Sequence, residues 1–222
     1  MSGKFKLYSF PISPFGCLIH AGLIYKKVDF EYHYVDLRGG KQKEPEYLAM
    51  HPFGQVPVLL TDSGQSIYES WSIFEFLEEQ FPDLNMLPKN QPDRAKVRSL
   101  CFVFMTGIMQ HVRDLFLETL GRHKLSDETR TAARENLVAK FEVFASELAT
   151  LENLPELTPL DAFFHQAWQN ASIGYPQIKE LVPSLEVYSQ SIAKKPAIIA
   201  VEATPEVKLI KQAFLSQLAT AK

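Results

Sequence analysis

The spacing of hydrophobic and polar positions changes near residue 82. Before that point the chain contains short β-rich runs, over residues 4–9, 30–35 and 56–60, which are separated by turn signals. The first of these runs alternates polar and apolar side chains, as half-buried strands do. After residue 93 the apolar side chains recur every three or four residues, which is typical of helices. The pattern therefore predicts a mixed α/β part followed by an all-helical part.

Prolines and glycines mark the boundaries of the elements in the first part. Pro14 suits the first turn of a helix that reaches about residue 27, and Ser13 suits its N-cap. The other predicted elements are a short helix over 45–49, strands over 56–60 and 66–68 that a tight turn joins, and a helix over 69–80. The order β-α-β-α-β-β-α is a thioredoxin-like layout, with four mixed strands and helices on the faces of the sheet.

Prolines at positions 82, 88 and 92 predict a linker over residues 82–92. We therefore expect a thioredoxin-like α/β domain over residues 1–81 and an all-α helical domain over residues 93–222. In the second domain, Thr158 and Asp161 have the spacing of an aspartate version of the capping box, with a proline at the first helical position. The helices expected there extend over 93–120, 126–151, 159–168, 175–194 and 205–219.

The run over residues 51–60 is the first candidate for a binding site. Pro57 has no N–H to donate to a strand ladder, so it is expected at a strand entrance or a sheet edge. Its neighbour Val56 then shows its own backbone N–H and C=O groups to whatever lies outside the sheet. A turn that contains Gly54 precedes this pair, and Glu69 opens a helix shortly after it. Such a layout suits the binding of a small peptide by its main chain.

Composition narrows the classes of partner. The 222 residues are 46% hydrophobic, and their formal net charge of -3 gives no electrostatic reason to expect a nucleic acid or an anionic membrane surface. No apolar run approaches the roughly 20 residues that span a bilayer, and the first residues lack the apolar core of a secretory signal. The two cysteines form no disulfide framework and the six histidines lack zinc-ligand spacing. We therefore expect a cytoplasmic protein without a metal site.

Taken together, these motifs resemble those of the cytosolic glutathione transferases. The resemblance is carried by the run over residues 51–57, by Glu69-Ser70 at a helix start and by the Thr158-x-x-Asp161 box. The segments 6–13 and 42–48 are most similar to the serine-type classes, which are the phi, theta and bacterial-like ones. The resemblance implies a homodimeric transferase that uses glutathione as co-substrate and needs no metal.

The resemblance also implies a role for each ligand-binding residue. The cysteinyl main chain of glutathione would pair with Val56, next to Gln55 and Pro57, and in this family that proline is cis. Ser70 and the N–H groups at its helix start would bind the γ-glutamyl carboxylate, while Glu69 would accept the ammonium group. Lys43 and Gln42 match the positions that meet the glycyl carboxylate. The alternatives are ordinary helix capping for Glu69 and Ser70, and solvated loop residues for Lys43 and Gln42.

Ser13 matches the catalytic serine of the serine-type classes. A hydroxyl at a helix N-terminus can donate to a thiolate and so lower the pKa of a thiol that is ordinarily about 8.5. The alternatives are that Ser13 is only an N-cap, or that Ser9 is the donor. Cys17 is expected to be a small buried residue rather than a nucleophile, and thiol-disulfide exchange by a reductase or isomerase is the second candidate chemistry. A non-catalytic interaction module is the third candidate.

The second substrate is expected to be a small apolar electrophile. We predict a pocket for it between the 93–120 helix and the Ser13 loop, because methionine and phenylalanine allow adaptable apolar packing. Conjugation is the expected reaction, with peroxide reduction as a further reaction of the same thiolate. Phe53, on the turn before Gly54, is a candidate for an apolar contact with a partner subunit. The predicted pocket residues are Phe15, Met105, Met109, Arg113 and Phe116.

Overall fold

The computed structural model describes residues 4–220, which form two compact units. One unit contains the chain up to Met86 together with the chain from Pro196 onward, and the other contains Leu87–Lys195. The outermost ends of the two expected domains, residues 1–3 and 221–222, lie outside the described residues.

The first unit is built on a four-stranded mixed sheet with the order β2-β1-β3-β4. Its strands are β1 (Phe5–Ser9), β2 (Phe30–Tyr34), β3 (Val58–Leu60) and β4 (Ser66–Tyr68). Strand β1 is parallel to β2 and antiparallel to β3, and β3 is antiparallel to β4. The four predicted strands and their mixture of parallel and antiparallel pairing are therefore confirmed.

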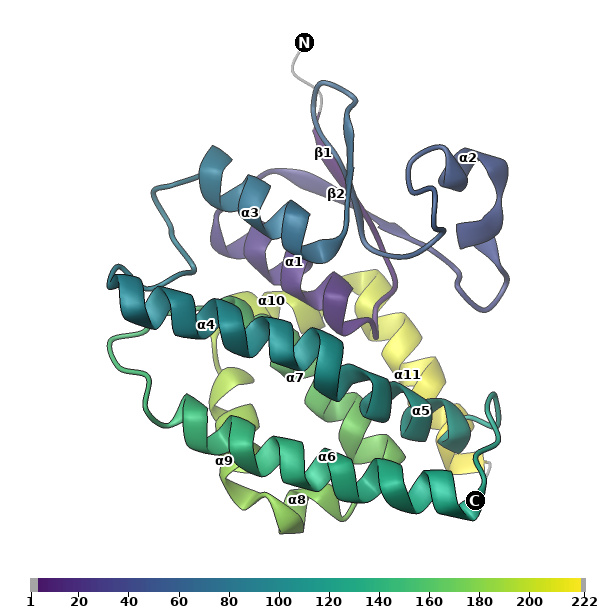
Figure 1. Ribbon diagram of the computed structural model, residues 1–222. Coiled ribbons are helices and arrows are strands. Elements are labelled where there is room, and N and C mark those ends of the chain that lie inside the picture. The colour runs from purple at the N-terminus through teal and green to yellow at the C-terminus, as the bar shows by residue number, and fades with distance from the viewer. Residues whose placement is uncertain (1–3, 221–222) are drawn as a thin grey trace. The chain divides into compact units, whose positions relative to one another are not determined.

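Helices cover the sheet as expected for a thioredoxin-like fold. Figure 1 shows α1 (Pro14–Tyr25) and α3 (Ser70–Gln80) side by side on one side of the sheet, with α2 (Pro45–Leu48) on the other. The side chains of β1 alternate accordingly, since Leu7 and Ser9 are buried while the intervening Tyr8 is only half-buried and packs on Tyr47. A 3₁₀ turn, η1 (Lys41–Lys43), precedes α2.

The last two helices pack with the first unit. Helix α10 (Pro196–Ala203), which the sequence analysis does not anticipate, lies against α1, and α11 (Pro205–Thr220) follows it. His20 of α1 lies 3.3 Å from the Thr204 hydroxyl, between Nε2 and Oγ1. The Arg38 guanidinium lies over the Phe214 ring at 5.4 Å. These contacts explain why residues 196–220 group with the sheet, although the sequence analysis places them in the helical domain.

The second unit is entirely helical among its described residues. The predicted 93–120 helix is found as α4 (Gln91–Val103) and α5 (Met109–Thr119), joined by a π-helical turn, η2 (Phe104–Ile108). Within this turn the Thr106 hydroxyl donates to the Phe102 carbonyl oxygen at 2.7 Å. The expected 175–194 helix is instead two helices, because Pro183 has no N–H to continue the first one. The other helices are α6 (Asp127–Leu148), α7 (Pro159–Gly174), α8 (Ile178–Leu181) and α9 (Pro183–Ile192).

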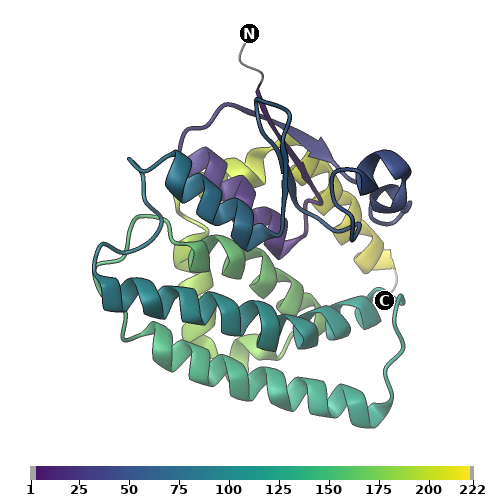
Figure 2. The same cartoon turned by 45° about the horizontal axis from the view of Figure 1, so that its top comes forward.

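Aromatic rings form the core of the second unit. Figure 2 shows α6 running beside the α4–α5 stretch, and Phe104 contacts Phe141 and Phe144 of α6 with ring centroids 5.8 and 5.1 Å apart. The predicted capping box at α7 is confirmed, since Thr158 Oγ1 accepts from the Asp161 N–H and the Asp161 carboxylate accepts from the Thr158 N–H. Asp161 also accepts from Tyr188 and Lys195, at 2.8 and 2.9 Å.

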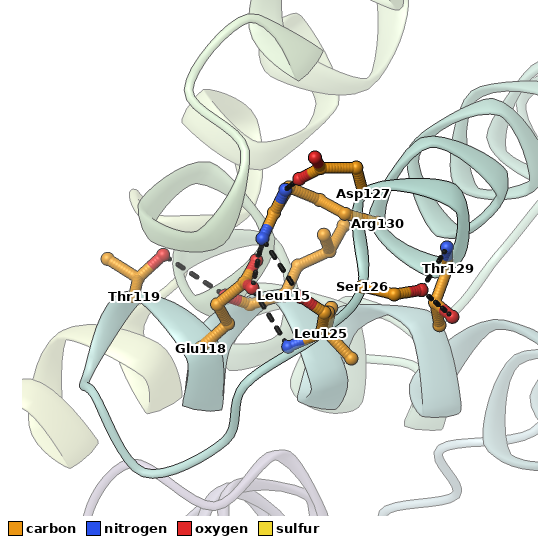
Figure 3. A network of polar contacts seen from close by, with 8 residues as sticks. All are labelled: Leu115, Glu118, Thr119, Leu125, Ser126, Asp127, Thr129 and Arg130. Carbon is orange, nitrogen blue, oxygen red and sulfur yellow. Dashed lines mark hydrogen bonds and ion pairs between the residues drawn. The ribbon is translucent and has the colours of Figure 1, made fainter.

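A network of hydrogen bonds and ion pairs links the end of α5 to the start of α6 (Figure 3). The Arg130 guanidinium donates to both carboxylate oxygens of Glu118 at 2.8 Å, and to Asp127. Glu118 also accepts from the Leu125 N–H at 3.1 Å. The paired guanidinium holds the pKa of the Glu118 carboxyl below its usual range. The network therefore fixes residues 120–126, which form no helix or strand of their own.

By length and composition alone, the continuous helical stretch Gln91–Thr119 would be able to cross a membrane. The hydrophobic pattern of the sequence alone does not predict such a stretch. Part of it is buried by other residues of the chain, through side chains such as Val97, Phe104 and Val112, and core helices of globular proteins meet the same test.

Candidate functional site

Three segments leave the sheet at the same end. Tyr8 of β1 pairs with Val58 of β3, and Val58 pairs with Tyr68 of β4. Because these neighbouring strands are antiparallel, the residues after Tyr8, before Val58 and after Tyr68 all lie beyond one end of the sheet. The register therefore brings the turn that leads to Ser13, the Pro57 segment and the start of α3 to one edge of the first unit.

Ser13 is the N-cap of α1. Its Oγ accepts a hydrogen bond from the Gly16 N–H at 3.2 Å, and its own N–H donates to the Phe10 carbonyl oxygen at 2.9 Å. Within the described part of the chain, the Ser13 hydroxyl hydrogen has no acceptor. A hydroxyl that accepts one hydrogen bond becomes a better donor in another, and the positive end of the α1 dipole favours an anion here. The N-cap role and a donor role are therefore compatible at this residue.

Ser9, the alternative donor, is buried beneath α1. It is 1% exposed. A Cβ atom added at Gly16 would lie 2.0 Å from Ser9 Oγ, so only a glycine allows α1 to approach β1 this closely. Ser9 consequently explains the glycine at position 16 and is not placed to meet a ligand.

The segment before β3 has the backbone that the family resemblance implies. The Val56–Pro57 peptide bond is cis. Val56 is half-buried, and neither its N–H nor its C=O has a hydrogen-bond partner among residues 4–220. Val58, two residues later, is already paired with its neighbouring strands. Val56 thus offers one donor and one acceptor at the sheet end where Ser13 also lies.

Glu69 and Ser70 stand at the start of α3, as predicted. Glu69 is exposed, and its backbone has a φ of 67° and a ψ of 119°, a conformation that residues other than glycine rarely adopt. Its carboxylate makes no capping hydrogen bond, so ordinary capping does not account for this residue. Ser70 is 5% exposed. Strained backbone of this kind is concentrated at functional sites, and the uncapped N–H groups of α3 favour an anion.

Lys43 and Gln42 lie on η1, next to the segment that leads to Pro57. Lys43 Nζ donates to the Phe53 carbonyl oxygen at 3.2 Å, and its side chain is exposed. Gln42 Nε2 makes a long contact of 3.4 Å with the Leu37 carbonyl oxygen. Gln42 Oε1 is buried and has no partner within the described residues. Lys43 therefore presents a cation directly, whereas the Gln42 amide has to turn before it can donate to a carboxylate.

His51 and Tyr47 belong to this site, although the sequence analysis gave neither a role. Burial lowers the pKa of His51 from its usual value of 6.5, so the imidazole is neutral at neutral pH. The charges of Glu69 and Lys43 also act on this pKa, Glu69 raising it and Lys43 lowering it. His51 packs on Tyr68 with ring centroids 4.9 Å apart. The Tyr47 hydroxyl donates to the Gln55 carbonyl oxygen at 2.7 Å. No local pattern signals these contacts, because they join segments that meet only in the fold.

Cys17 lies inside α1 and is 5% exposed. Burial raises the pKa of its thiol to about 12, so the thiol is protonated at neutral pH and is a poor nucleophile. The expectation of a small buried residue agrees with this environment.

The residues predicted to line an electrophile pocket come from both units. Phe15, on the first turn of α1, is half-buried. On the other unit, the Arg113 side chain is 69% exposed and lies 3.5 Å from Asp114. Their assignment to one pocket stays a prediction. The remaining members, all on η2 and α5, are Met105, which is half-buried, and Met109 and Phe116, which are buried.

Comparisons with known proteins agree with this layout. Residues 7–89 match the family model for the N-terminal domain of glutathione S-transferases. Glutathione S-transferase 1 of Dianthus caryophyllus is 34% identical over 139 residues, which cover 62% of each chain. A probable maleylacetoacetate isomerase of Caenorhabditis elegans is 37% identical over 46% of this chain and 47% of its own. The chain thus spans about half to three fifths of the length of these relatives.

Solved structures share the fold across nearly the whole chain. The glutathione transferase URE2P8 of Phanerochaete chrysosporium, solved with oxidized glutathione, has a TM-score of 0.81 at 20% identity. That match covers 95% of this chain and 98% of the other. Residues 7–89 thus resemble the N-terminal domain of glutathione S-transferases, and nearly the whole chain shares its fold with a solved glutathione transferase.

Proposed function

We propose that the protein is a glutathione transferase that activates the thiol of glutathione as a thiolate. The observation that carries the proposal is the unpaired backbone of Val56 beside cis-Pro57, at the sheet end where Ser13 keeps a hydroxyl hydrogen to donate. A main-chain donor and acceptor on one residue suit the cysteinyl unit of a peptide, as in an added β-strand. The names and bound ligands of the similar proteins support the same ligand.

The rest of the site suits the two ends of glutathione. Glu69 would accept the γ-glutamyl ammonium group, and Ser70 with the uncapped N–H groups of α3 would bind the neighbouring carboxylate. Lys43 would meet the glycyl carboxylate, joined by Gln42 once its amide turns. These roles explain why Glu69, an exposed carboxylate on a strained backbone, and the exposed ammonium group of Lys43 flank the Val56 segment.

Ser13 would supply the catalytic step. Its O–H donates to the thiolate sulfur, which lowers the thiol pKa, and the released proton passes to solvent. The thiolate then attacks an electrophilic carbon, a C–S bond forms, and the electron pair leaves with the displaced group or takes up a proton. With a hydroperoxide, the same thiolate would attack oxygen, and a second glutathione would complete the reduction to glutathione disulfide, an alcohol and water.

The composition of α1 bears on the second substrate. Among the 12 residues of this helix there is no Lys, Arg, Asp or Glu, and Phe15 follows the proline that starts it. A helix without a cation next to Ser13 favours a neutral, apolar electrophile over an anionic one such as a dicarboxylate. Conjugation of apolar electrophiles is therefore a better proposal than isomerisation of maleylacetoacetate, despite the similarity to a protein of that name.

We place the enzyme in the cytoplasm as a homodimer. The two cysteines are free and buried, which fits a reducing compartment. Phe53 is 66% exposed and contacts His51 and Tyr68 edge-on, with ring centroids 6.2 and 6.4 Å apart. An exposed aromatic side chain braced by two others suits insertion into a second copy of the chain.

Calorimetric titration with glutathione, followed by a conjugation assay with an activated aryl halide, tests this function. The wild type should bind glutathione and conjugate the halide. Glu69→Gln should weaken binding roughly tenfold or more, because a charge-assisted hydrogen bond is lost. Glu44→Gln is the matched control, since Glu44 pairs with the exposed Lys41 and should leave binding unchanged.

Two outcomes would overturn the proposal. A wild type that does not bind glutathione would favour a non-catalytic interaction module. A mixed disulfide between glutathione and Cys17, together with reductase activity that Cys17→Ser abolishes, would favour thiol-disulfide exchange instead.

A further inference from the structure

The segment that leads to Pro57 is held from one side by η1 and α2. Lys43 Nζ donates to the Phe53 carbonyl oxygen at 3.2 Å, and the Tyr47 hydroxyl donates to the Gln55 carbonyl oxygen at 2.7 Å. Between these two carbonyls, Gly54 has a φ of 60°, and a Cβ atom added there would lie 2.6 Å from the Gln42 carbonyl oxygen. The segment therefore packs closely against η1, and hydrogen bonds from η1 and from α2 hold one carbonyl each.

Tyr47 is itself rigidly placed. It is 6% exposed and belongs to a core cluster with Val35 and Val58, and its ring meets the Tyr8 ring edge-on with centroids 6.4 Å apart. Val56 packs against the same cluster. A side chain that the core holds in this way is a fixed donor, and its hydroxyl position is set before any ligand arrives.

The bond from Tyr47 has a consequence for the next residue. The Gln55 carbonyl and the Val56 N–H belong to the same peptide group, which is planar and trans, so the two point in opposite directions. A donor that holds the carbonyl from the α2 side therefore turns the Val56 N–H away from α2. This N–H has no partner within the described part of the chain.

We propose that Tyr47 is a positioning residue for glutathione, whose hydroxyl sets the Gln55–Val56 peptide plane and so aims the Val56 N–H at the cysteinyl carbonyl of the ligand. The inference rests on the proposed function. Tyr47 and Ser13 have different roles under this proposal. Tyr47 affects the affinity for glutathione through the backbone, whereas Ser13 affects the pKa of the glutathione thiol. Without the hydroxyl, this peptide group has to be ordered when the ligand binds, and that cost weakens binding.

The test is Tyr47→Phe, which keeps the ring and removes only the donor. We expect the Kd for S-methylglutathione and the KM for glutathione to rise roughly threefold to tenfold, the usual range for one hydrogen bond. The kcat at saturation, the KM for the electrophile and the pKa of the bound thiol should not change. Placing 4-aminophenylalanine at position 47, whose amine can donate to the same carbonyl, should restore much of the affinity.

Tyr188→Phe is the matched control. Tyr188 is half-buried in the other unit and donates to the Asp161 carboxylate at 2.8 Å, so its loss should lower stability without changing glutathione affinity. Affinity of Tyr47→Phe within twofold of the wild type would overturn the inference while leaving the proposed function intact. Absence of glutathione binding by the wild type would overturn both.

A measurement on the wild type covers the case in which Tyr47→Phe does not fold. Residual dipolar couplings report the orientation of the Val56 N–H bond in the free protein and in the glutathione complex. An unchanged orientation relative to the sheet supports a preset peptide, and a large reorientation on binding contradicts it.

Discussion

Lys26 and Glu78 form a buried ion pair between the ends of α1 and α3. Lys26 Nζ lies 2.7 Å from Glu78 Oε1, and the two side chains are 0% and 8% exposed. Lys26 Nζ also donates to the carbonyl oxygens of Phe81 and Leu84 at 2.9 Å, and Glu78 accepts from the Met86 N–H at 3.1 Å. One pair thus holds the chain that leaves α3, over residues 81–86, onto the first unit.

Lys26→Met should destabilise the first unit strongly. The substitution leaves the Glu78 carboxylate buried without its cation and frees two carbonyl groups, a change that typically costs about 3–5 kcal/mol. Urea unfolding followed by circular dichroism measures the effect. The double variant Lys26→Met/Glu78→Leu should recover part of the loss, because it removes both charges.

Lys41→Met is the control for this prediction. Lys41 and Glu44 form a pair of the same length, 2.7 Å, but their side chains are 59% and 49% exposed. Solvent screens such a pair, so its loss should leave the unfolding midpoint nearly unchanged. Equal effects of Lys26→Met and Lys41→Met would mean that the buried pair does not hold residues 81–86.

Gly16→Ala should destabilise the protein by roughly 1–3 kcal/mol, the usual cost of overpacking. The added methyl group would overlap Ser9 Oγ, and Ser9 is buried, so it cannot move aside easily. Thermal unfolding tests this directly. Gly107→Ala is the control, because its added carbon would meet only the flexible end of Lys140 at 3.6 Å. A Gly16→Ala protein as stable as wild type would contradict the close packing of α1 on β1.

His20 should make stability depend on pH. Burial lowers the pKa of His20 from 6.5 to about 4, so between these values the unfolded chain binds a proton that the folded protein does not. The free energy of unfolding should therefore fall as the pH drops from about 6.5 to 4, by roughly 3 kcal/mol from this residue.

The measurement is the unfolding free energy at a series of pH values for the wild type and His20→Gln. Glutamine does not titrate, so the variant should lose less stability on acidification than the wild type does. Parallel pH profiles for the two proteins would show that His20 is not buried in its neutral form.

Local patterns predicted most elements of the first unit, whereas the ligand roles proposed for its residues were implied by the resemblance to a known family. Pro57 and Glu69 were identified because a proline at a strand entrance and an acidic residue at a helix start have direct structural consequences. The contacts that hold these residues were not predictable in the same way. Tyr47 reaches Gln55, and Lys26 reaches Leu84, only once the chain has folded, and neither pairing leaves a periodic signal.

In the helical part, too, local motifs were predictable and features that depend on the tertiary fold were not. The capping box of Thr158 and Asp161 is a local motif and was predicted. Helix α10 (Pro196–Ala203) was missed because it is short and its apolar residues are nearly continuous, which gives no amphipathic pattern. Its packing on α1 depends on the tertiary fold. The π-helical turn at Phe104–Ile108 likewise changes the backbone without interrupting the helical spacing of side chains.

The pKa of the glutathione thiol bound to the protein tests the role of Ser13 most directly. Ultraviolet absorbance of the thiolate, recorded against pH, gives this pKa for the wild type, Ser13→Ala and Ser126→Ala. Ser126 is the control because it caps α6 through the same contact, accepting from the Thr129 N–H at 3.1 Å. We predict that the wild type lowers the thiol pKa well below its free value of about 8.5, and that Ser126→Ala does the same. Ser13→Ala should return the pKa to near that value. An equally low thiol pKa in Ser13→Ala would contradict the proposed mechanism.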